Sequence, residues 1–400
     1  MLAEVRAAAP DVVVVVHAGD GPVPDELLGF DALATQGDPI EDVRQSGDAL
    51  SGIFYTGGTT GFPKGVMLSH TNLLTSSYGA LSAGIVTVRP RFLHVAPMFH
   101  IADYSCAVSV LVTGGVHVML PGFEPVQTLT TVQRERITDL GLIPIMLQLL
   151  ADHPQSNDYD LSSLKSVFYG GSSITPAALE RVLARFPHVR LAQAFGQTEA
   201  SPVLTWLNDD AHQDRTRPGL LASAGRAGMH TEVMVVDPAG AELPHGEQGE
   251  IVGRGGNIML GYWNRPGETD TALRDGWLHT GDVGRMDDDG YLYVLDRLKD
   301  MILSGGENVY CAEVENAAAS HPAVAACAVL GLPHPVWGER VHAVVVLKPG
   351  ADATEQEIRD HVRTRIAGYK VPATVEFVTE LQVSAAGKIL KRELRAERTT

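Results

Sequence analysis

The sequence predicts an α/β fold, with a large N-terminal domain of layered, mostly parallel sheets and helices and a small α+β domain after it. Up to about residue 215, short β-branched runs alternate with longer helical stretches, which is typical of a parallel sheet covered by helices. From Ala224 to Leu295, Gly and Pro interrupt short apolar runs, which predicts a small antiparallel barrel or meander. After Asp296 the pattern becomes that of a compact α+β segment. A chain of 400 residues is also too long for one ordinary domain.

Each predicted element follows from a local pattern of apolar residues and helix signals. Strands of the large domain are expected at the runs Val12–His17, Gly52–Tyr55, Phe92–Val95, Val116–Leu120, Ser166–Tyr169 and Val189–Ala194. Its helices are expected at His70–Ala83, Val126–Glu135 and Pro176–Phe186, the last with Thr175 as N-cap and Pro176 at its first position. The antiparallel part contributes Glu232–Val236, Gly249–Gly253 and Tyr291–Leu295. The C-terminal segment contributes helices near Ala312–Ser320 and Glu355–Ile366 and strands Ala323–Leu330 and Arg340–Leu347.

These patterns place a domain boundary near Arg297–Asp300. We expect residues 1–298 to form the large domain, with an α/β part at 1–215 and a barrel-like part at 216–298. Residues 299–400 are expected to form the small domain.

Composition excludes several functional classes. The formal net charge of −17, from 31 Lys and Arg against 48 Asp and Glu, argues against a nucleic-acid partner, which needs a basic face. The three cysteines, Cys106, Cys311 and Cys327, have neither metal-type nor disulfide-type spacing. Apolar runs are too short for a transmembrane helix, and no signal-peptide pattern opens the sequence. We therefore expect a cytoplasmic protein with no integral membrane segment.

The strongest motif is the segment from Tyr55 to Gly65, which reads Tyr-Thr-Gly-Gly-Thr-Thr-Gly-Phe-Pro-Lys-Gly. Its four glycines and three threonines allow the backbone to form a nest of N–H donors, which hydroxyl groups and Lys64 can supplement. Such a loop suits a polyphosphate, although its spacing is not that of a Walker A motif. The alternative is a plain turn rich in Gly and Thr.

This loop resembles the phosphate-binding loop of the adenylate-forming (AMP-binding) superfamily, which includes acyl- and aryl-CoA synthetases, luciferases and adenylation domains of peptide synthetases. Further motifs of that superfamily occur in order along the chain. They are Pro97–His100, Tyr169–Ser172, Phe195–Glu199, Gly249–Glu250, Gly261–Trp263, Trp277–Asp282, Asp296–Asp300, Ser304–Asn308, Tyr369–Pro372 and Gly387–Lys391. The resemblance covers nearly everything from Ser51 to Arg395. It implies an acyl-CoA synthetase that uses ATP, Mg²⁺ and coenzyme A and acts on a small-molecule carboxylic acid.

The resemblance also implies residue roles in the attack of a carboxylate on the α-phosphate of ATP, where donors and cations must offset developing charge. Residues implied to contact ATP or AMP are Thr56, Gly57, Gly58, Thr59, Thr60, Gly61, Lys64, Gly170, Gly171, Ser172, Phe195, Gly196, Gln197, Thr198, Asp282 and Arg297. Lys388, Thr198, Glu199 and His100 are the implied catalytic residues, and Glu199 is the implied Mg²⁺ ligand. Without the resemblance, Glu199 would equally suit the cap of a turn.

The implied acyl pocket contains Phe99, His100, Ala102 and Tyr169. Because Ala102 is small, we expect a deep slot for a medium- to long-chain fatty acid; an aryl acid is the alternative. A lone histidine such as His100 is otherwise more often structural. Asp103 is expected to be solvated or to cap a helix, so it gives no support for an amino-acid substrate.

The second half-reaction, transfer of the acyl group to the thiol, implies that the small domain is mobile and rotates between two arrangements. Lys299 is the implied hinge residue, and Gly305 and Gly306 lie on the implied path of coenzyme A. A carrier protein is an alternative acceptor, although no carrier segment follows in this sequence.

Relatives usually carry on the order of a hundred or more residues before the phosphate loop, whereas 54 residues precede Tyr55 here. We therefore expect missing sheet strands and self-association into a homo-oligomer. An inactive module that only binds nucleotide is the remaining alternative.

Overall fold

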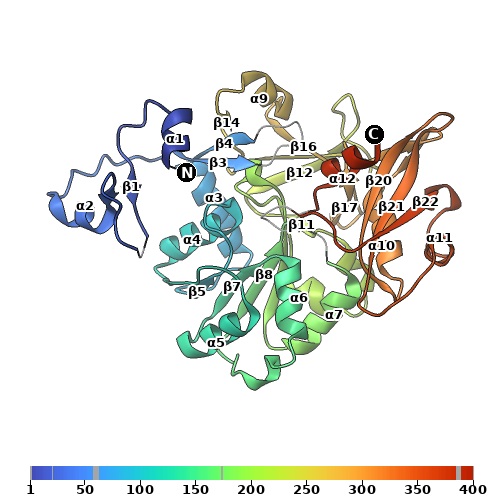
Figure 1. The fold of residues 1–400 in the computed structure, drawn as a ribbon, viewed down its shortest axis with the longest axis horizontal. Coiled ribbons are helices and arrows are strands. Elements are labelled where there is room, and N and C mark those ends of the chain that lie inside the picture. Colours follow the sequence, from blue (N-terminus) through green and yellow to red (C-terminus); the bar gives the residue numbers. More distant parts are fainter. Residues whose placement is uncertain (1, 20, 57–62, 173, 384–388, 400) are drawn as a thin grey trace. The chain divides into compact units, whose positions relative to one another are not determined.

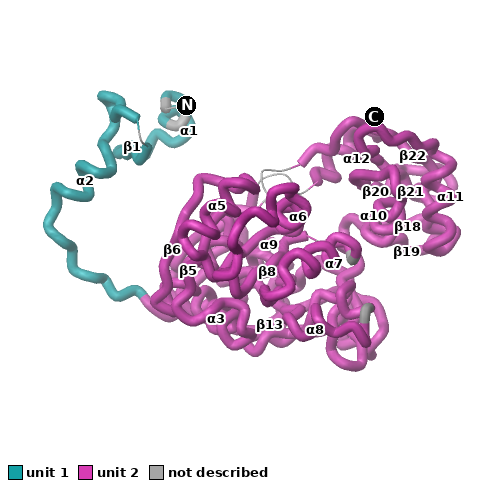
Figure 2. Tube along the Cα trace, turned by 90° about the horizontal axis from the view of Figure 1, so that it is seen from below, with its two compact units in different colours: residues 1–45 teal, residues 46–400 magenta. Residues whose placement is uncertain are grey.

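The computed structural model describes residues 2–19, 21–56, 63–172, 174–383 and 389–399, in two compact units of residues 1–45 and 46–400 (Figure 2). The first unit contains α1 (Leu2–Ala8), β1 (Val16–His17), β2 (Leu28–Gly29) and α2 (Phe30–Gln36), with β1 and β2 paired in parallel. The predicted strand Val12–His17 is therefore wrong except for its last two residues. Val13 is 93% exposed, so this valine run has no apolar layer against which to pack.

The centre of the second unit is a seven-stranded sheet of order β11-β10-β9-β8-β7-β5-β6 (Figure 1). Its parallel strands are β5 (Arg91–His94), β6 (Val116–Met119), β7 (Asp139–Leu142), β8 (Ser166–Gly170) and β9 (Arg190–Phe195). β10 (Thr205–Leu207) and β11 (Arg226–Ala227) add an antiparallel edge. Four of the parallel strands are confirmed to within one or two residues. β7 was not predicted, because its apolar run continues into the helix that starts at Pro144.

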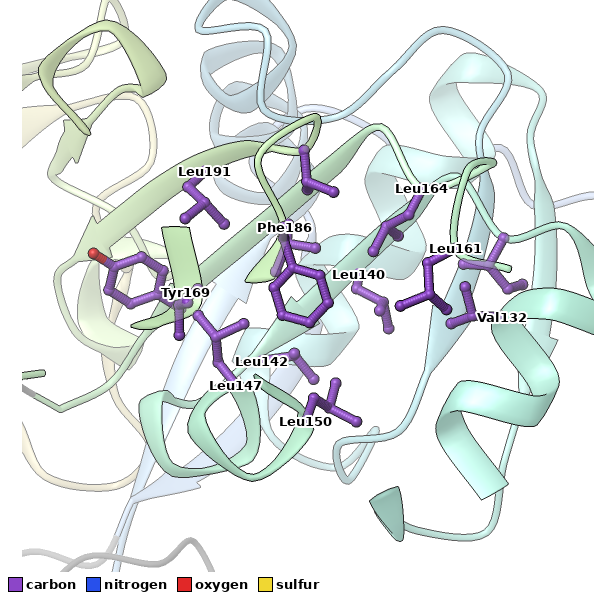
Figure 3. Packing of buried hydrophobic residues seen from close by; sticks show 14 of the residues in the cluster. Val132, Leu140, Leu142, Leu147, Leu150, Leu161, Leu164, Tyr169, Phe186 and Leu191 are labelled. Carbon is purple, nitrogen blue, oxygen red and sulfur yellow. The ribbon is translucent and has the colours of Figure 1, made fainter. Parts of the chain in front are cut away.

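Helices cover both faces of this sheet. They are α3 (His70–Ser82), α4 (Ile101–Thr113), α5 (Pro125–Glu135), α6 (Pro144–Asp152), α7 (Pro176–Arg185) and α8 (Asp209–Gln213). Apolar residues of α5, α6 and α7 pack with strand residues such as Leu140 and Leu191 in one large cluster (Figure 3). On the other face, Phe92 packs with Cys106 and Val110 of α4. The α7 cap is confirmed, because the Thr175 hydroxyl accepts from the Ala178 amide at 3.3 Å.

Two smaller sheets complete the part before residue 298. β3 (Leu50–Thr56) and β4 (Lys64–Ser69) form an antiparallel pair, and β14 (Gly261–Tyr262) joins the β4 edge. A five-stranded antiparallel sheet contains β12 (Thr231–Val236), β13 (Gly249–Gly255), β15 (Leu273–Arg274), β16 (Trp277–Met286) and β17 (Leu292–Arg297). The predicted antiparallel meander is thus confirmed. Helix α9 (Pro266–Ala272) and the 3₁₀ turns η1 (Ser156–Asp158), η2 (Thr198–Ala200) and η3 (Pro218–Ala222) lie in the connections.

The C-terminal α+β part has its own five-stranded sheet. Its strands are β18 (Ile302–Ser304), β19 (Glu307–Val309), β20 (Val324–His334), β21 (Gly338–Leu347) and β22 (Thr374–Val378). Helices α10 (Cys311–Ala319), α11 (Glu355–Arg363) and α12 (Lys391–Thr399), with η4 (Gly368–Lys370), complete it. A separate cluster, including Val314, Val329, Val345 and Ile358, forms its core. The predicted helices and strands here are confirmed, with shifts of a few residues at their ends.

Within the part of the chain that the structure describes, none of the helices combines the length and hydropathy that a membrane span needs.

Candidate active site

Glu199 and Tyr262 form the best-defined polar contact among the motif residues. Glu199 lies in η2, just after the carboxyl end of β9, and is 8% exposed. The hydroxyl of Tyr262 donates to Glu199 Oε1 at 2.7 Å. Burial, followed by the negative charge of Glu199, raises the pKa of Tyr262 well above its usual range, so this phenol remains a donor. Only one carboxylate oxygen of Glu199 takes part in this bond.

Lys64 connects the phosphate-loop motif to the same pair. Strand β14 pairs with β4, with Tyr262 opposite Val66, and this register brings the Lys64 ammonium group to 4.3 Å from the centre of the Tyr262 ring. At the other end of the loop, the Thr56 hydroxyl donates to the carbonyl of Lys64 at 3.4 Å. Three motifs far apart in the sequence therefore meet at one place, with a cation over the ring of Tyr262 and a carboxylate at its hydroxyl. The predicted loop residues Gly57, Gly58, Thr59, Thr60 and Gly61 lie outside the described residues.

Two predicted nucleotide-site glycines are required by close backbone approach. A Cβ at Gly196 would lie 2.2 Å from the carbonyl oxygen of Pro202, and Gly196 has φ 158°. A Cβ at Gly170 would lie 2.6 Å from the carbonyl oxygen of Ala194 on the neighbouring strand. Both glycines lie at the carboxyl ends of parallel strands, β8 and β9, where α/β sheets commonly bind ligands. Gly171 and Ser172 follow Gly170 at this edge, and Gln197 and Thr198 follow Gly196.

Asp282 and Arg297 form a second group. They are directly opposite each other on β16 and β17, and Arg297 Nε lies 2.7 Å from Asp282 Oδ1. Asp282 is 4% exposed, whereas the Arg297 side chain is 41% exposed, so the pair reaches from the interior to the surface. Glu250 holds the turn before Asp282, because its Oε1 accepts from the Gly281 amide at 3.1 Å. The other oxygen of Glu250 contacts His279 Nδ1 at 2.8 Å.

The next residues along the chain connect β17 to the C-terminal α+β part. Asp296 Oδ1 accepts from the Arg297 amide at 2.8 Å, and its Oδ2 accepts from the amide of Cys311 at the start of α10. Burial raises the pKa of Asp296. Burial also lowers the pKa of Lys299, the predicted hinge residue.

Gly305 and Gly306 form the two-residue turn between β18 and β19. Their φ angles are 63° and 88°, values that favour glycine, and a Cβ at either position would meet nothing within 4 Å. The turn is therefore open as well as tight. Lys388, the predicted adenylation lysine, lies outside the described residues.

The predicted acyl-pocket residues fall into two environments. His100 caps α4, where its Nδ1 accepts from the Ala102 amide at 3.4 Å. Phe99 is 76% exposed, and Ala102 lies exposed in the first turn of the same helix. Tyr169, in contrast, is fully buried in the core beneath α6 and α7, and its hydroxyl contacts His212 Nε2 at 2.9 Å (Figure 3).

The expectation that Asp103 is solvated or caps a helix is wrong. Asp103 is 2% exposed, and its Oδ2 lies 2.9 Å from Nδ1 of the equally buried His94. Sequence reasoning missed His94 because it ends an apolar strand. It also gave no role to Tyr262 or Glu250, although both belong to motifs that were recognised.

Glu199 suits the magnesium ion that the family implies. Mg²⁺ in nucleotide sites is typically held by one or two carboxylates, with substrate phosphates and water completing the octahedron. Glu199 lies in η2, three residues after Gly196, and only its Oε1 takes part in the Tyr262 bond. Among the described residues, no group of three or more His, Cys, Asp or Glu forms a metal cage. The residues thus fit an ion that arrives with its nucleotide.

Comparisons with known proteins identify the family of the chain. A model of the AMP-binding enzyme family matches residues 1–263, and a model of the AMP-binding enzyme C-terminal domain matches residues 313–388. A feruloyl-CoA synthase from an Amycolatopsis species is 44% identical over 344 residues, which cover 86% of this chain and 69% of the relative. A medium/long-chain-fatty-acid–CoA ligase from Mycobacterium tuberculosis is 39% identical over 389 residues, which cover 94% of this chain and 67% of the relative.

The solved structure of an amide bond synthetase from Marinactinospora thermotolerans has a TM-score of 0.87 and 36% identity, covering 100% of this chain and 79% of that protein. Fold, site and relatives together define an ATP-using ligase of the acyl-CoA synthetase class. The chain belongs to the AMP-binding enzyme family.

Proposed function

We propose that this enzyme activates a medium- to long-chain fatty acid as its acyl-adenylate, with release of pyrophosphate, and then transfers the acyl group to coenzyme A. The observation that carries the proposal is the convergence of Lys64, Tyr262 and Glu199. It joins the phosphate-loop strand, the strand that pairs with it and the end of β9 into one site. A cation and a buried carboxylate there can serve the phosphates of ATP and its metal ion, respectively.

In the first half-reaction, the acid attacks the α-phosphate and pyrophosphate leaves. Charge develops on the phosphoryl oxygens and the leaving group, so prepositioned donors and cations lower the barrier. Lys64, the Thr198 hydroxyl and Lys388 are the groups that we assign to this task. When bound at Glu199, Mg²⁺ would supply further charge neutralisation to the phosphates. Tyr262 fixes one oxygen of Glu199 and so orients the other.

The ribose of ATP has a suitable partner in Asp282. A carboxylate has two oxygens that accept hydrogen bonds, which matches two adjacent ribose hydroxyls. Arg297 holds Oδ1 of Asp282 through Nε, while Glu250 fixes the preceding turn. We assign the adenine to the edge lined by Gly170, Gly171 and Phe195, where a Cβ at Gly171 would meet only Ile143, at 3.9 Å.

For the second half-reaction, we assign residues 299–400 as a lid that turns about Lys299. Asp296 and Arg297 would remain with β17 while the lid moves. The Gly305–Gly306 turn, which is open in this structure, would then border the path of the thiol. Both positions of this turn have a positive φ, which is why two consecutive glycines suit it.

Substrate choice rests on the exposed first turn of α4. Ala102 presents only a methyl group there, which leaves room for an extended acyl chain. The similarity to a feruloyl-CoA synthase favours an aryl acid as the second candidate. The similarity to an amide bond synthetase makes an amine a second candidate acceptor.

The test is carboxylate-dependent ATP–pyrophosphate exchange with fatty, aryl and amino acids, followed by product analysis with coenzyme A, a carrier protein or an amine as acceptor. We expect exchange with octanoate and longer acids, and a thioester with coenzyme A. Exchange with ferulate-type acids alone would establish the aryl alternative. Nucleotide binding without exchange for any acid would contradict the proposal.

A further inference from the structure

A buried chain of three polar side chains lies beside the proposed acyl pocket. His94 ends β5, and Asp103 lies in the first turn of α4. Their side chains are only 2% and 1% exposed, and Nδ1 of His94 is 2.9 Å from Oδ2 of Asp103. On its other side, His94 Nε2 lies 3.0 Å from Nδ1 of His117 on the edge strand β6, and the two rings stack.

One order of donors and acceptors satisfies all of these contacts. A carboxylate oxygen of Asp103 accepts, so Nδ1 of His94 carries the hydrogen between them. Nε2 of His94 then accepts from Nδ1–H of His117. Burial and the neighbouring His94 lower the pKa of the half-buried His117, which favours a neutral His117. Each polar atom between Asp103 Oδ2 and His117 Nδ1 therefore has a partner.

The sheet holds one end of the segment that carries the acyl-pocket residues, and the chain of side chains holds the other. At the first end, β5 pairs with β6 and β7. At the second end, Asp103 ties α4 to the last residue of β5, although nine positions separate them. Between these ends lies His100, whose carbonyl accepts from the Asp103 amide at 3.2 Å. The Cys106 thiol adds a 2.9 Å contact to the carbonyl of Ala102.

We propose that the Asp103–His94–His117 chain positions the first turn of α4 and so determines which carboxylic acids the enzyme accepts. Burial of a carboxylate and two imidazoles is costly unless they pair, and an apolar contact would hold a helix with less directional precision. The proposal rests on the proposed function, because it takes the wall formed by His100 and Ala102 to face the acyl group. Asp103 and His94 are positioning residues in this scheme and do not touch the substrate.

The first experiment separates positioning from stability. In Asp103→Ala, we expect the KM for octanoate to rise about tenfold or more, since small displacements of a binding group have large effects. The octanoate-to-benzoate preference should change, while the KM for ATP should not. Asp103→Asn should keep the KM for octanoate and the acid preference close to those of the wild type, because the amide oxygen still accepts from His94. In the double variant His94→Leu/Asp103→Leu, the melting temperature should recover without recovery of acid preference, since only the half-buried His117 then loses a partner and no fully buried member of the chain is left alone.

Asp139→Ala is the matched control. Asp139 is also buried, at 1% exposure, but it begins β7, at the amino ends of the parallel strands and away from His94 at their carboxyl ends, and it bonds to Thr87 and Thr138. Its replacement should lower the melting temperature and leave acid preference unchanged. The proposal is overturned if Asp139→Ala changes acid preference as much as Asp103→Ala. It is also overturned if the Leu double variant regains wild-type acid preference together with its stability.

A second measurement is independent of catalysis. Nuclear magnetic resonance of ¹⁵N-histidine-labelled full-length protein should show a hydrogen-bonded Nδ1–H of His94 that is lost in Asp103→Ala, with a change at His117. If wild-type protein catalyses no carboxylate-dependent exchange, the proposed function fails, while this spectrum still reports on the chain. If the Nδ1–H signal is absent from the wild type, the positioning proposal fails whatever the activity.

Discussion

The hydroxyl of Tyr262 donates a 2.7 Å hydrogen bond to Oε1 of Glu199, and this contact ties strand β14 to the end of β9. The two residues are 63 positions apart, and both are buried. The Lys64 ammonium group lies 4.3 Å from the centre of the same ring, so Tyr262 contacts both a cation and a carboxylate of the motif residues.

Tyr262→Phe removes that bond and leaves the ring. A hydrogen bond to a charged group contributes about 1.5–3 kcal/mol, so we expect lower stability and a roughly ten- to hundredfold loss in exchange rate. Because Glu199 would lose its orientation, the Mg²⁺ concentration needed for half-maximal exchange should rise. A magnesium titration of the exchange rate checks this. Tyr293→Phe is the control, since its hydroxyl makes only a 3.3 Å contact to Asp287 outside the site; an equal effect of both variants would argue against the role of Tyr262.

Gly196→Ala tests the close approach of backbone at the carboxyl end of β9. The added Cβ would lie 2.2 Å from the Pro202 carbonyl oxygen, so the turn must move. We expect a loss of about 1–3 kcal/mol in the free energy of unfolding, as for other overpacked sites, together with a raised KM for ATP. Urea unfolding and exchange kinetics measure both. In Gly267→Ala the Cβ meets nothing within 4 Å, so this helix position should be neutral or slightly stabilising.

His212 should make stability sensitive to mild acid. Its Nδ1 donates to the Asn208 carbonyl at 2.8 Å, and its Nε2 lies 2.9 Å from the Tyr169 hydroxyl in a buried setting that favours the neutral ring. Burial lowers the pKa of His212 below its unfolded value. The folded state therefore gains stability above the unfolded pKa and loses it as pH falls through the folded pKa. A difference of one pH unit between the folded and unfolded pKa values corresponds to about 1.4 kcal/mol of stability.

The measurement for His212 is urea unfolding at pH 7.5 and pH 5.5. Wild-type protein should lose more stability between these values than His212→Gln, which keeps an uncharged polar group there. His245→Gln, at a largely exposed histidine, should behave like the wild type. A wild-type protein and a His212→Gln variant with the same pH dependence would rule out His212 as the cause.

Much of the fold could be predicted because its signals are local. The strands at Phe92 and Val167 are short runs rich in apolar and aromatic residues, and Thr175 and Pro176 mark a helix start by their own chemistry. The motif residues of the site could be found by resemblance, but their contacts could not. Asp103 shows the reason: its partner His94 is brought close only when the chain turns back between β5 and α4. Likewise, the meeting of Lys64 with Tyr262 depends on a strand register that the sequence does not contain locally.

Ala102→Tyr tests the acyl pocket directly. A bulky side chain at this exposed position of α4 should shorten the slot. The kcat/KM for octanoate should therefore fall relative to that for benzoate. Apolar pockets discriminate by about 1–3 kcal/mol per methylene, which corresponds to roughly 10- to 200-fold in kcat/KM. Competition between the two acids in the exchange assay measures the change. Leu111→Tyr is the control, because Leu111 is 70% exposed near the other end of α4 and should leave acid preference unchanged. An unchanged acid preference in Ala102→Tyr would show that this turn does not line the pocket.

Lys388 and Gly305 should separate the two half-reactions. Lys388→Ala removes a cation that we assign to the α-phosphate, and the loss of one such transition-state contact typically costs about 10²–10³-fold in rate. The same variant should still convert supplied acyl-adenylate and coenzyme A to thioester at a near-normal rate, because the lid has turned by then.

Gly305→Leu should have the opposite pattern, since its side chain would enter the open space at the β18–β19 turn. Its φ of 63° also strains any L-residue by about 1–2 kcal/mol, so the melting temperature must be measured beside the rates. Gly350→Leu, at a turn with φ 76° and an equally open Cβ position, controls for that strain. If Lys388→Ala and Gly305→Leu lose both half-reactions equally while Gly350→Leu loses neither, a single fixed arrangement of the active site must replace domain rotation.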